Sequence, residues 1–407
     1  MQNLPARVSS IASAIATTVA MTVASTILLA TPAAARVPCG GSFSSFLAQM
    51  KAEAIARGYP KRTVERFFAG ARQDPKTLKA DRAQGVFRMS FIDFSRRVIS
   101  KYRLNLARKH ARELDPVFRR IARRYGIPRG VLLALWALET DFGQVQGDFN
   151  TLNSLLTLSH DCRRPELFQP QVLAALELYR RGDFDPARTT GAWAGEIGMV
   201  QMLPGDILEN GVDGDGDGHV RLKTSPADAL MSGARMLQAM GWRANQPWLQ
   251  EIAVPATLDW SKTGVGKTLT VAQWQRLGVK ARTGRLGPAA LRASVILPMG
   301  RKGPAFLAYP NFNVLFKWNQ SFTYVTSAAY FATRIEGAPV YDAGQPDPLL
   351  SLAQMKALQQ KLARRGYDVG EIDGILGAGT RDAVQREQLR LGLPADGWPT
   401  AELLNRL

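Results

Sequence analysis

The sequence is poor in cysteine, histidine and acidic residues. Its 407 residues include two Cys, three His and 34 Asp or Glu, against 52 Lys or Arg. So few Cys and His argue against a zinc cluster or a Cys–His nucleophile system. The net charge of +18 indicates an anionic partner. Because the basic residues are spread along the chain and no helix-turn-helix, zinc-finger or RNP motif occurs, we expect an anionic lipid or an acidic cell-wall polymer rather than nucleic acid.

Charge is also scarce at the N-terminus, where Arg7 is the one charged residue in positions 1–35. An uncharged, mostly apolar run from Ile11 to Ala30 precedes Ala33-Ala34-Ala35, a small-residue site of the kind that signal peptidases cleave. The run approaches spanning length, so an uncleaved membrane anchor is the alternative. The interspersed Ser and Thr favour a cleaved signal peptide, residues 1–35, and a periplasmic protein.

The even cysteine count suggests one disulfide in an exported chain. It would join Cys39, close to the mature N-terminus, to Cys162. Two unconnected thiols are the alternative. The Arg-Val-Pro that precedes Cys39 is unlike a lipoprotein site, so we do not expect lipidation.

Hydrophobic periodicity divides the chain. Apolar residues recur three and four positions apart from Phe43 to about Gly241, which predicts helices. Short apolar pieces among Gly, Pro and Thr predict a small β-containing insertion at 250–300, and a helix should return from about Asn313 to Ile335. A Pro/Gly-rich linker follows at 337–348.

Residues 349–407 contain two segments with a similar sequence pattern. Gly370-Glu-Ile-Asp-Gly374 and Leu393-Pro-Ala-Asp-Gly397 each follow a helical run and precede a Thr. This pattern resembles the peptidoglycan-binding domain 1 module, although Trp398 stands where Gly is usual. A generic three-helix cap is the alternative. The residues that match the module's signature are Asp373, Gly374, Gly377, Thr380 and Ala383.

Glu139 interrupts the apolar run that begins at Val131. On a helix it shares a face with Leu135, Trp136 and Phe142. Desolvation there would raise the pKa of the carboxyl, which suits an acid that protonates a glycosidic oxygen. Taken alone, a salt-bridged structural carboxylate is the stronger interpretation. Conventional glycosidases also need a second carboxylate. Asp141 points away from the Glu139 face, and no spacing selects among Asp148, Asp161, Glu166 and Glu196.

Three further segments carry groups suited to binding. Gln201 follows a Gly/Ala-rich stretch that begins at Gly191, and its amide suits sugar hydroxyl or amide groups. Aromatic residues interleave with Asn between Tyr309 and Tyr324, as in many saccharide sites. Helix packing is the alternative for both of these segments.

The third segment resembles an EF-hand-type loop. Asp213, Asp215 and Asp217 alternate with Gly and precede His219, whose carbonyl would be a ligand. The twelfth position is Thr224 instead of the usual Glu, and Asp228 could close a longer loop. A solvated acidic turn is the alternative.

In this order the segments resemble the B-type lytic murein transglycosylases, glycoside hydrolase family 103, over about residues 40–336. The resemblance implies a mainly α protein: a lysozyme-like α+β catalytic domain at 36–336, with a small β-containing insertion, and a three-helix domain at 349–407. The matching motifs are Trp136-x-x-Glu139-Thr-x-x-Gly143, Trp193-Ala-Gly-x-x-Gly198, Gln201-Met-Leu-Pro204, Asp217-Gly-His219, Asn311-Phe-x-Val314 and Asn319-x-Ser321-x-x-Tyr324.

The resemblance also implies a mechanism. Glu139 would be the sole acid/base and would protonate the bond between N-acetylmuramic acid and N-acetylglucosamine. The muramyl C6 hydroxyl would then attack C1 and leave a 1,6-anhydromuramyl end, which removes the need for a second carboxylate. Two positions depart from the family pattern, because Ala192 replaces a frequent Ser and Trp318 replaces a Tyr. A hydrolytic muramidase and a non-catalytic wall-binding scaffold are the rival functions.

Binding residues follow from the same resemblance. No cofactor is expected for the chemistry. We expect peptidoglycan glycan strands, with other cell-wall enzymes as further partners, and a monomer that does not bind nucleic acid. The substrate-binding residues would be Gln201, Asn319, Tyr324, Trp318 and Trp193, and a structural Ca²⁺ or Na⁺ would be held by Asp213, Asp215, Asp217, His219 and Asp228.

Overall fold

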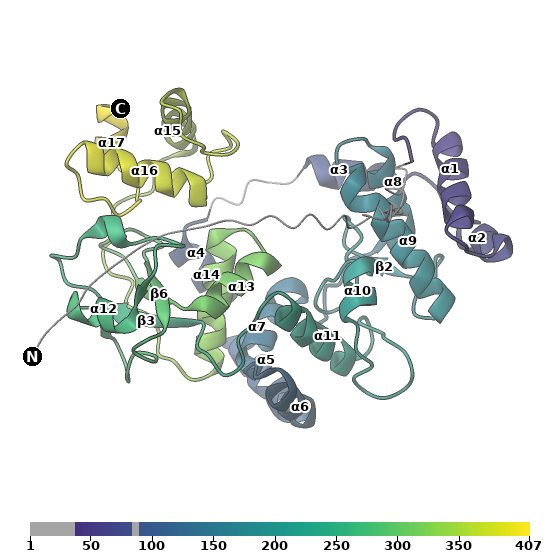
Figure 1. Ribbon diagram of the computed structural model, residues 1–407, viewed down its shortest axis with the longest axis horizontal. Helices are drawn as coiled ribbons and strands as arrows, with labels where there is room; N and C mark the ends of the chain where they lie inside the picture. Colours follow the sequence, from purple (N-terminus) through teal and green to yellow (C-terminus); the bar gives the residue numbers. More distant parts are fainter. Residues whose placement is uncertain (1–36, 84–88) are drawn as a thin grey trace, which may run out of the picture. The chain divides into compact units, whose positions relative to one another are not determined.

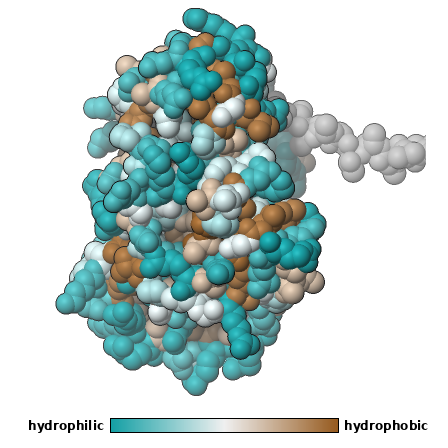
Figure 2. Space-filling model, turned by 90° about the vertical axis from the view of Figure 1, so that its left-hand side faces the viewer, coloured by the Kyte–Doolittle hydropathy of each residue, from teal (hydrophilic) through white to brown (hydrophobic). Residues whose placement is uncertain are grey.

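The computed structural model describes residues 37–83 and 89–407. The predicted signal peptide at 1–35 lies outside the described residues. Within these ranges, no helix combines the length and hydrophobicity needed to cross a membrane. The hydrophilic and hydrophobic residues on the face in Figure 2 are intermixed, and the hydrophobic ones gather in small separate areas.

Residues 43–239 are mainly helical. The helix α7 (Arg129–Thr140) packs against α5, α6 and α11 and against the later helix α14 (Phe322–Ile335), whereas α1, α2, α3, α8 and α9 pack on one another (Figure 1). Every α7 residue from Gly130 to Ala137 is buried. A Leu- and Ala-rich sequence with no Gly or Pro after Gly130 favours this helix, and positive φ angles at Asp141 and Phe142 end it. The other bounds are α1 Phe43–Ala56, α2 Lys61–Phe67, α3 Pro75–Arg82, α4 Phe91–Val98, α5 Lys101–Glu113, α6 Asp115–Tyr125, α8 Thr151–His160, α9 Pro165–Arg181, α10 Pro204–Asn210 and α11 Pro226–Ala239.

Two short strands and one disulfide tie this helical region together. Strand β1 (Phe149–Asn150) pairs antiparallel with β2 (Thr190–Gly191). The sulfurs of Cys39 and Cys162 are bonded, with Cα atoms 5.2 Å apart, so the segment before α1 is joined to the end of α8. Next to this bond, the Gly40 amide donates to the His160 carbonyl at 2.9 Å.

The predicted β-containing insertion is a five-stranded antiparallel sheet with strand order β4-β6-β7-β3-β5. Ala308 of β7 lies opposite Leu249 of β3 and Ser294 of β6. Trp274 is fully buried in the core beside this sheet and donates through Nε1 to the Ala293 carbonyl at 2.8 Å. The bounds are β3 Leu249–Ala253, η1 Trp260–Lys262, β4 Leu269–Thr270, α12 Val271–Arg276, β5 Lys280–Ala281, β6 Arg292–Ile296 and β7 Ala305–Ala308.

The helix expected from Asn313 to Ile335 is two helices, so the prediction of one continuous helix was wrong. α13 (Pro310–Trp318) ends at Asn319, whose backbone is extended, and α14 (Phe322–Ile335) begins after Ser321. The Ser321 hydroxyl accepts from the Tyr324 amide at 3.3 Å and caps α14. Local side-chain bonding by Asn and Ser competes with helical hydrogen bonds, which explains the break.

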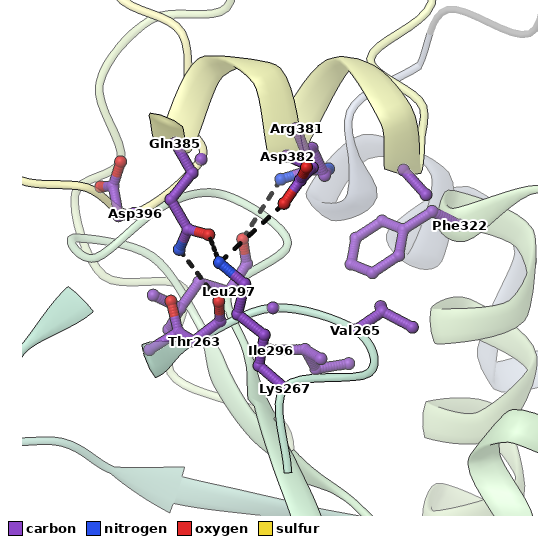
Figure 3. Close-up of a pocket in the computed structure, with 13 residues that line it drawn as sticks. Thr263, Val265, Lys267, Ile296, Leu297, Phe322, Arg381, Asp382, Gln385 and Asp396 are labelled. Carbon is purple, nitrogen blue, oxygen red and sulfur yellow. Dashed lines mark hydrogen bonds and ion pairs between the residues drawn. The ribbon is translucent and has the colours of Figure 1, made fainter. Parts of the chain in front are cut away.

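The C-terminal module consists of α15 (Leu352–Arg364), α16 (Ala378–Arg390) and α17 (Ala401–Arg406). Its α16 packs on the sheet region around a cavity of about 70 Å³, and Arg381 and Gln385 point toward that region (Figure 3). Arg381 donates to the Pro298 carbonyl at 2.8 Å, and burial lowers its pKa to about 10. Gln385 donates to the Thr263 carbonyl at 2.9 Å.

Trp398, the unusual residue of the module's second turn, belongs to the same interface. Its ring faces the Arg381 guanidinium at 5.6 Å, and its indole N–H donates to the Asp347 carbonyl at 3.0 Å. Gly300 lies directly against it, because a Cβ added at Gly300 would lie 2.6 Å from the Trp398 Cβ. The second Asp-Gly turn therefore docks the module onto the rest of the chain.

Candidate active site

Glu139 lies in the last turn of α7, at the point where the helix emerges from the core. Its neighbours Trp136 and Thr140 are buried, whereas Glu139 itself is partly exposed. Asp141 lies beyond the helix end and pairs with Arg103 at 2.8 Å. The arrangement therefore presents one carboxyl group, rather than two, at this end of α7.

Two donors hold a single oxygen of the Glu139 carboxyl group. The Trp318 indole N–H donates to Oε1 at 2.9 Å, and the Tyr324 hydroxyl donates to the same oxygen at 2.5 Å. No hydrogen bond to Oε2 occurs within the described residues. Oε1 is thus anchored, while Oε2 is the oxygen that can exchange a proton with another group.

Burial decides the ionisation of this group. It raises the pKa of Glu139, and the two hydrogen bonds from Tyr324 and Trp318 oppose the rise because they favour the carboxylate. The pKa of Tyr324 is in turn raised well above its usual value by burial and by the nearby carboxylate. Tyr324 therefore remains a hydroxyl donor at physiological pH.

The break between α13 and α14 makes this contact possible. Trp318 ends one helix and Tyr324 lies in the first turn of the next, so both side chains reach the same carboxyl group. Asn319 lies between them, and its Oδ1 accepts from the Ser321 amide at 2.9 Å, which leaves its amide N–H₂ for another partner. Trp318 stands where Tyr is usual, so the phenol hydroxyl is missing. The indole N–H of Trp318 supplies a hydrogen-bond donor to Glu139 in its place.

Gln201 lies in a turn with φ of 52°, a conformation that is uncommon for a residue other than Gly. Its Nε2 donates to the Gly198 carbonyl at 2.8 Å and to the Gln146 carbonyl at 3.4 Å. The amide donor is therefore used within the protein, and the side-chain oxygen is the group left to accept from a ligand. Trp193, in the same segment, packs partly buried against the main core.

Glu196 carries a second carboxyl group, in addition to that of Glu139. The spacing of the acidic residues in the sequence did not identify it as part of the site. Its Oε2 is buried without a hydrogen-bond partner. Burial raises its pKa, and the charge of Glu139 adds to the rise, while Arg164 opposes it. Of the alternatives, Asp161 instead pairs with Arg82 at 2.9 Å. Glu196 could not be identified from spacing because it follows a glycine turn rather than a helix repeat.

The acidic loop brings Asp213, Asp215 and Asp217 together, with carboxylate oxygens within 4.8 Å of one another. Oxygen ligands of this kind suit a hard cation. His219 follows Asp217 as expected, and its ring nitrogen Nδ1 lies 2.8 Å from Asp183 Oδ1. The ring is therefore turned to Asp183, which leaves only the predicted carbonyl role for His219.

Asp228 holds the backbone of the acidic loop. It is fully buried, and its two oxygens accept from the Gly214 amide at 2.8 Å and the Arg221 amide at 2.7 Å. These bonds fix the loop's backbone, and the role of Asp228 as a ligand stays a prediction. The residues present thus fit a cation held by three carboxylates.

Comparisons with known proteins agree with this architecture. Residues 42–333 match the transglycosylase SLT domain family, and residues 351–407 match a peptidoglycan binding domain. SltB3 from Pseudomonas aeruginosa, solved in complex with NAG-anhNAM-pentapeptide, is 35% identical and has a TM-score of 0.82 over 90% of this chain and 99% of that chain. A second SltB3 structure, in complex with NAG-NAM-pentapeptide, matches at the same identity and TM-score over 90% of this chain and 100% of that chain.

A curated relative extends the comparison. Membrane-bound lytic murein transglycosylase B of Escherichia coli (strain K12) is 29% identical over 203 residues, which are 49% of this chain and 55% of the relative. The match thus spans about half the length of that protein. The predicted fold class and the predicted resemblance are confirmed, and the chain belongs to the transglycosylase SLT domain family, with a peptidoglycan-binding module at its C-terminus.

Proposed function

We propose that the protein is a lytic transglycosylase that cleaves the β-1,4 bond between N-acetylmuramic acid and N-acetylglucosamine in peptidoglycan. The observation that carries the proposal is the Glu139 carboxyl group, with Oε1 held by Trp318 and Tyr324 and Oε2 unbonded. The SltB3 complexes, which contain muropeptides with and without the anhydro ring, support the substrate class.

Each step of the proposed reaction can be assigned to a particular chemical group. Protonated Oε2 of Glu139 gives its proton to the glycosidic oxygen, and the bond from that oxygen to C1 breaks. The muramyl C6 hydroxyl forms the new bond to C1 and returns its proton to Glu139, so no water is consumed. Trp318 and Tyr324 stabilise the carboxylate between the two transfers, because hydrogen bonds to a charged group are the stronger ones.

Hydrolysis by a muramidase is the second candidate, and Glu196 is the observation that favours it. A second carboxyl group near the acid could activate water. Mass spectrometry of products released from purified sacculi separates the two. Anhydromuramyl ends support the transglycosylase, whereas reducing ends support the muramidase.

Tyr324→Phe tests how Oε1 is held. Removing a donor that stabilises the carboxylate should raise the pKa of Glu139 further, so the high-pH limb of kcat/KM should move to higher pH. Loss of one hydrogen bond to a charged group should also lower the maximal rate about tenfold. Trp318→Phe should act in the same direction. A lower rate with an unmoved pH profile would contradict this role for the hydroxyl.

We also propose that the acidic loop holds a structural Ca²⁺ or Na⁺ through Asp213, Asp215 and Asp217. Saturating Ca²⁺ should raise the melting temperature by about 2–4 °C, if binding contributes about 1 kcal/mol. Asp215→Asn should remove the increase, while Asp148→Asn, an exposed Asp outside the loop, should keep it. An equal shift in both variants would indicate non-specific binding.

The expected location is the periplasm, with the N-terminal 35 residues removed. Sequencing the N-terminus of protein recovered from the cell envelope should find Arg36 first. An intact Met1 in a membrane fraction would instead support the uncleaved anchor.

A further inference from the structure

The C-terminal module contacts the helix that carries Tyr324. Phe322, the first residue of α14, is buried, and the guanidinium carbon of Arg381 in α16 lies 4.6 Å from the centre of its ring. Figure 3 shows these two side chains approaching each other from the two helices. A cation placed over an aromatic ring in this way is attracted to it, most strongly where water is excluded. The contact therefore joins the module to the part of the chain that holds the catalytic acid.

Phe322 also connects the two helices that supply the donors to Glu139. Its ring stacks on that of Phe316 in α13, with the ring centroids 6.3 Å apart. Phe316 lies two residues before Trp318. In the same way, Phe322 lies two residues before Tyr324. A displacement of the stacked rings would therefore move both groups that donate to Oε1 of Glu139.

The hydrogen bonds within the turn between α13 and α14 are local. Asn319 Oδ1 accepts from the Ser321 amide, and the Ser321 hydroxyl accepts from the Tyr324 amide. Such bonds fix the shape of the turn, but they do not set its distance from α7. Thr323, beside Phe322, lines a second cavity of about 170 Å³ together with residues of the module. The first turn of α14 thus has the module as a direct neighbour.

Arg381 occupies its position at an energetic cost. Burial lowers its pKa to about 10, so the group is still charged at neutral pH, and its Nε is buried with no hydrogen-bond partner within the described residues. Its other nitrogens donate to the Pro298 carbonyl at 2.8 Å and the Leu297 carbonyl at 3.4 Å. An apolar side chain could fill such an interface without desolvating a charge. The cation is better explained by contacts that need it, of which the Phe322 ring is one.

We propose that Arg381 is a positioning residue for the catalytic acid, an inference that rests on the proposed function. Through Phe322 it holds the first turn of α14 at the distance from α7 that keeps Trp318 and Tyr324 bonded to Oε1. The C-terminal module therefore supports cleavage itself, in addition to any binding of the wall.

The test compares the full chain with an Arg381→Gln variant on short, soluble glycan fragments, for which wall binding by the module contributes little. Weaker support of α14 should loosen the two hydrogen bonds to Glu139 and lower kcat about three- to tenfold, with little change in KM. The high-pH limb of kcat/KM should also move to higher pH, because these bonds favour the carboxylate. Glu196, whose pKa responds to the charge of Glu139, is unchanged in the variant.

Three further variants serve as controls, and melting curves show whether each one folds. Arg364→Gln removes an exposed arginine of α15 in the same module and should behave like the parent. Arg381→Lys keeps a cation beside the ring and should restore most of the rate and the pH profile. Phe322→Leu removes the ring, so adding Arg381→Gln to it should have no further effect on either quantity.

Four results would overturn the proposal: an unchanged kcat in Arg381→Gln, a lower rate with an unmoved pH profile, an equal effect of Arg364→Gln, or additive effects of Arg381→Gln and Phe322→Leu. If Arg381→Gln does not fold, Phe322→Leu alone decides, since it should move the same limb to higher pH and an unmoved limb would overturn the proposal. Failure of the proposed function has a separate signature. The parent protein would then release no anhydromuramyl products from the same fragments.

Discussion

Glu139→Gln should lower the release of muropeptides from sacculi by about 10²–10⁴-fold, the usual contribution of a general acid–base group. The amide keeps an oxygen that can accept from Trp318 and Tyr324, but it cannot supply a proton. Binding to sacculi should be unchanged, so the loss falls on kcat rather than KM. The measurement is the rate of soluble product formation, separated by chromatography.

The same substitution has a predictable effect on stability. Burial raises the folded-state pKa of Glu139 above its unfolded value, so the native state loses stability as pH rises from the unfolded pKa through the folded one. Gln removes that cost, and the variant should be at least as stable as the parent near neutral pH. A folded variant that retains full activity would exclude Glu139 as the acid, and a variant that unfolds would contradict the expected stability.

Replacing Cys39 and Cys162 with Ser should lower the free energy of unfolding by about 2–5 kcal/mol. The bond closes a loop with a sequence separation of 123, so its loss greatly increases the freedom of the unfolded chain. Urea titration of the double variant measures the change.

Reduction of the parent protein with dithiothreitol provides the control, since it should reproduce most of the loss without any substitution. The activity of the folded double variant should be retained, because the bond joins the segment before α1 to the end of α8, whereas the helices that pack on α7 are α5, α6, α11 and α14. A double variant as stable as the oxidised parent would show that α1 is held by other contacts, such as those between Gln169 and the Val37 backbone.

The sequence allowed Glu139 and its helix to be predicted because α7 has a strong apolar pattern that a carboxylate interrupts. The β-containing insertion was likewise visible from short apolar segments between Gly and Pro. The break at Asn319 was not predicted, although Asn and Ser are the residues that cap helices. Without it, the joint contact of Trp318 and Tyr324 with Oε1 could not be anticipated.

Other features depend on tertiary contacts that no local pattern records. Glu196 approaches Glu139 only because a glycine turn folds back, and Asp228 stabilises the loop it was expected to complete as a ligand. Trp398 departs from the sequence pattern of the module. Its contacts with Gly300 and Arg381 in the interface explain why a large aromatic residue stands there.

The central claim is that Glu139 promotes cleavage in which the substrate's own C6 hydroxyl, rather than water, attacks C1. The most direct test is digestion of sacculi in water enriched in heavy oxygen, followed by mass spectrometry of the released muropeptides. The parent protein should release anhydromuramyl products that contain no heavy oxygen, and the Glu139→Gln variant should release none of these products. Reducing ends that carry one heavy oxygen would contradict the central claim.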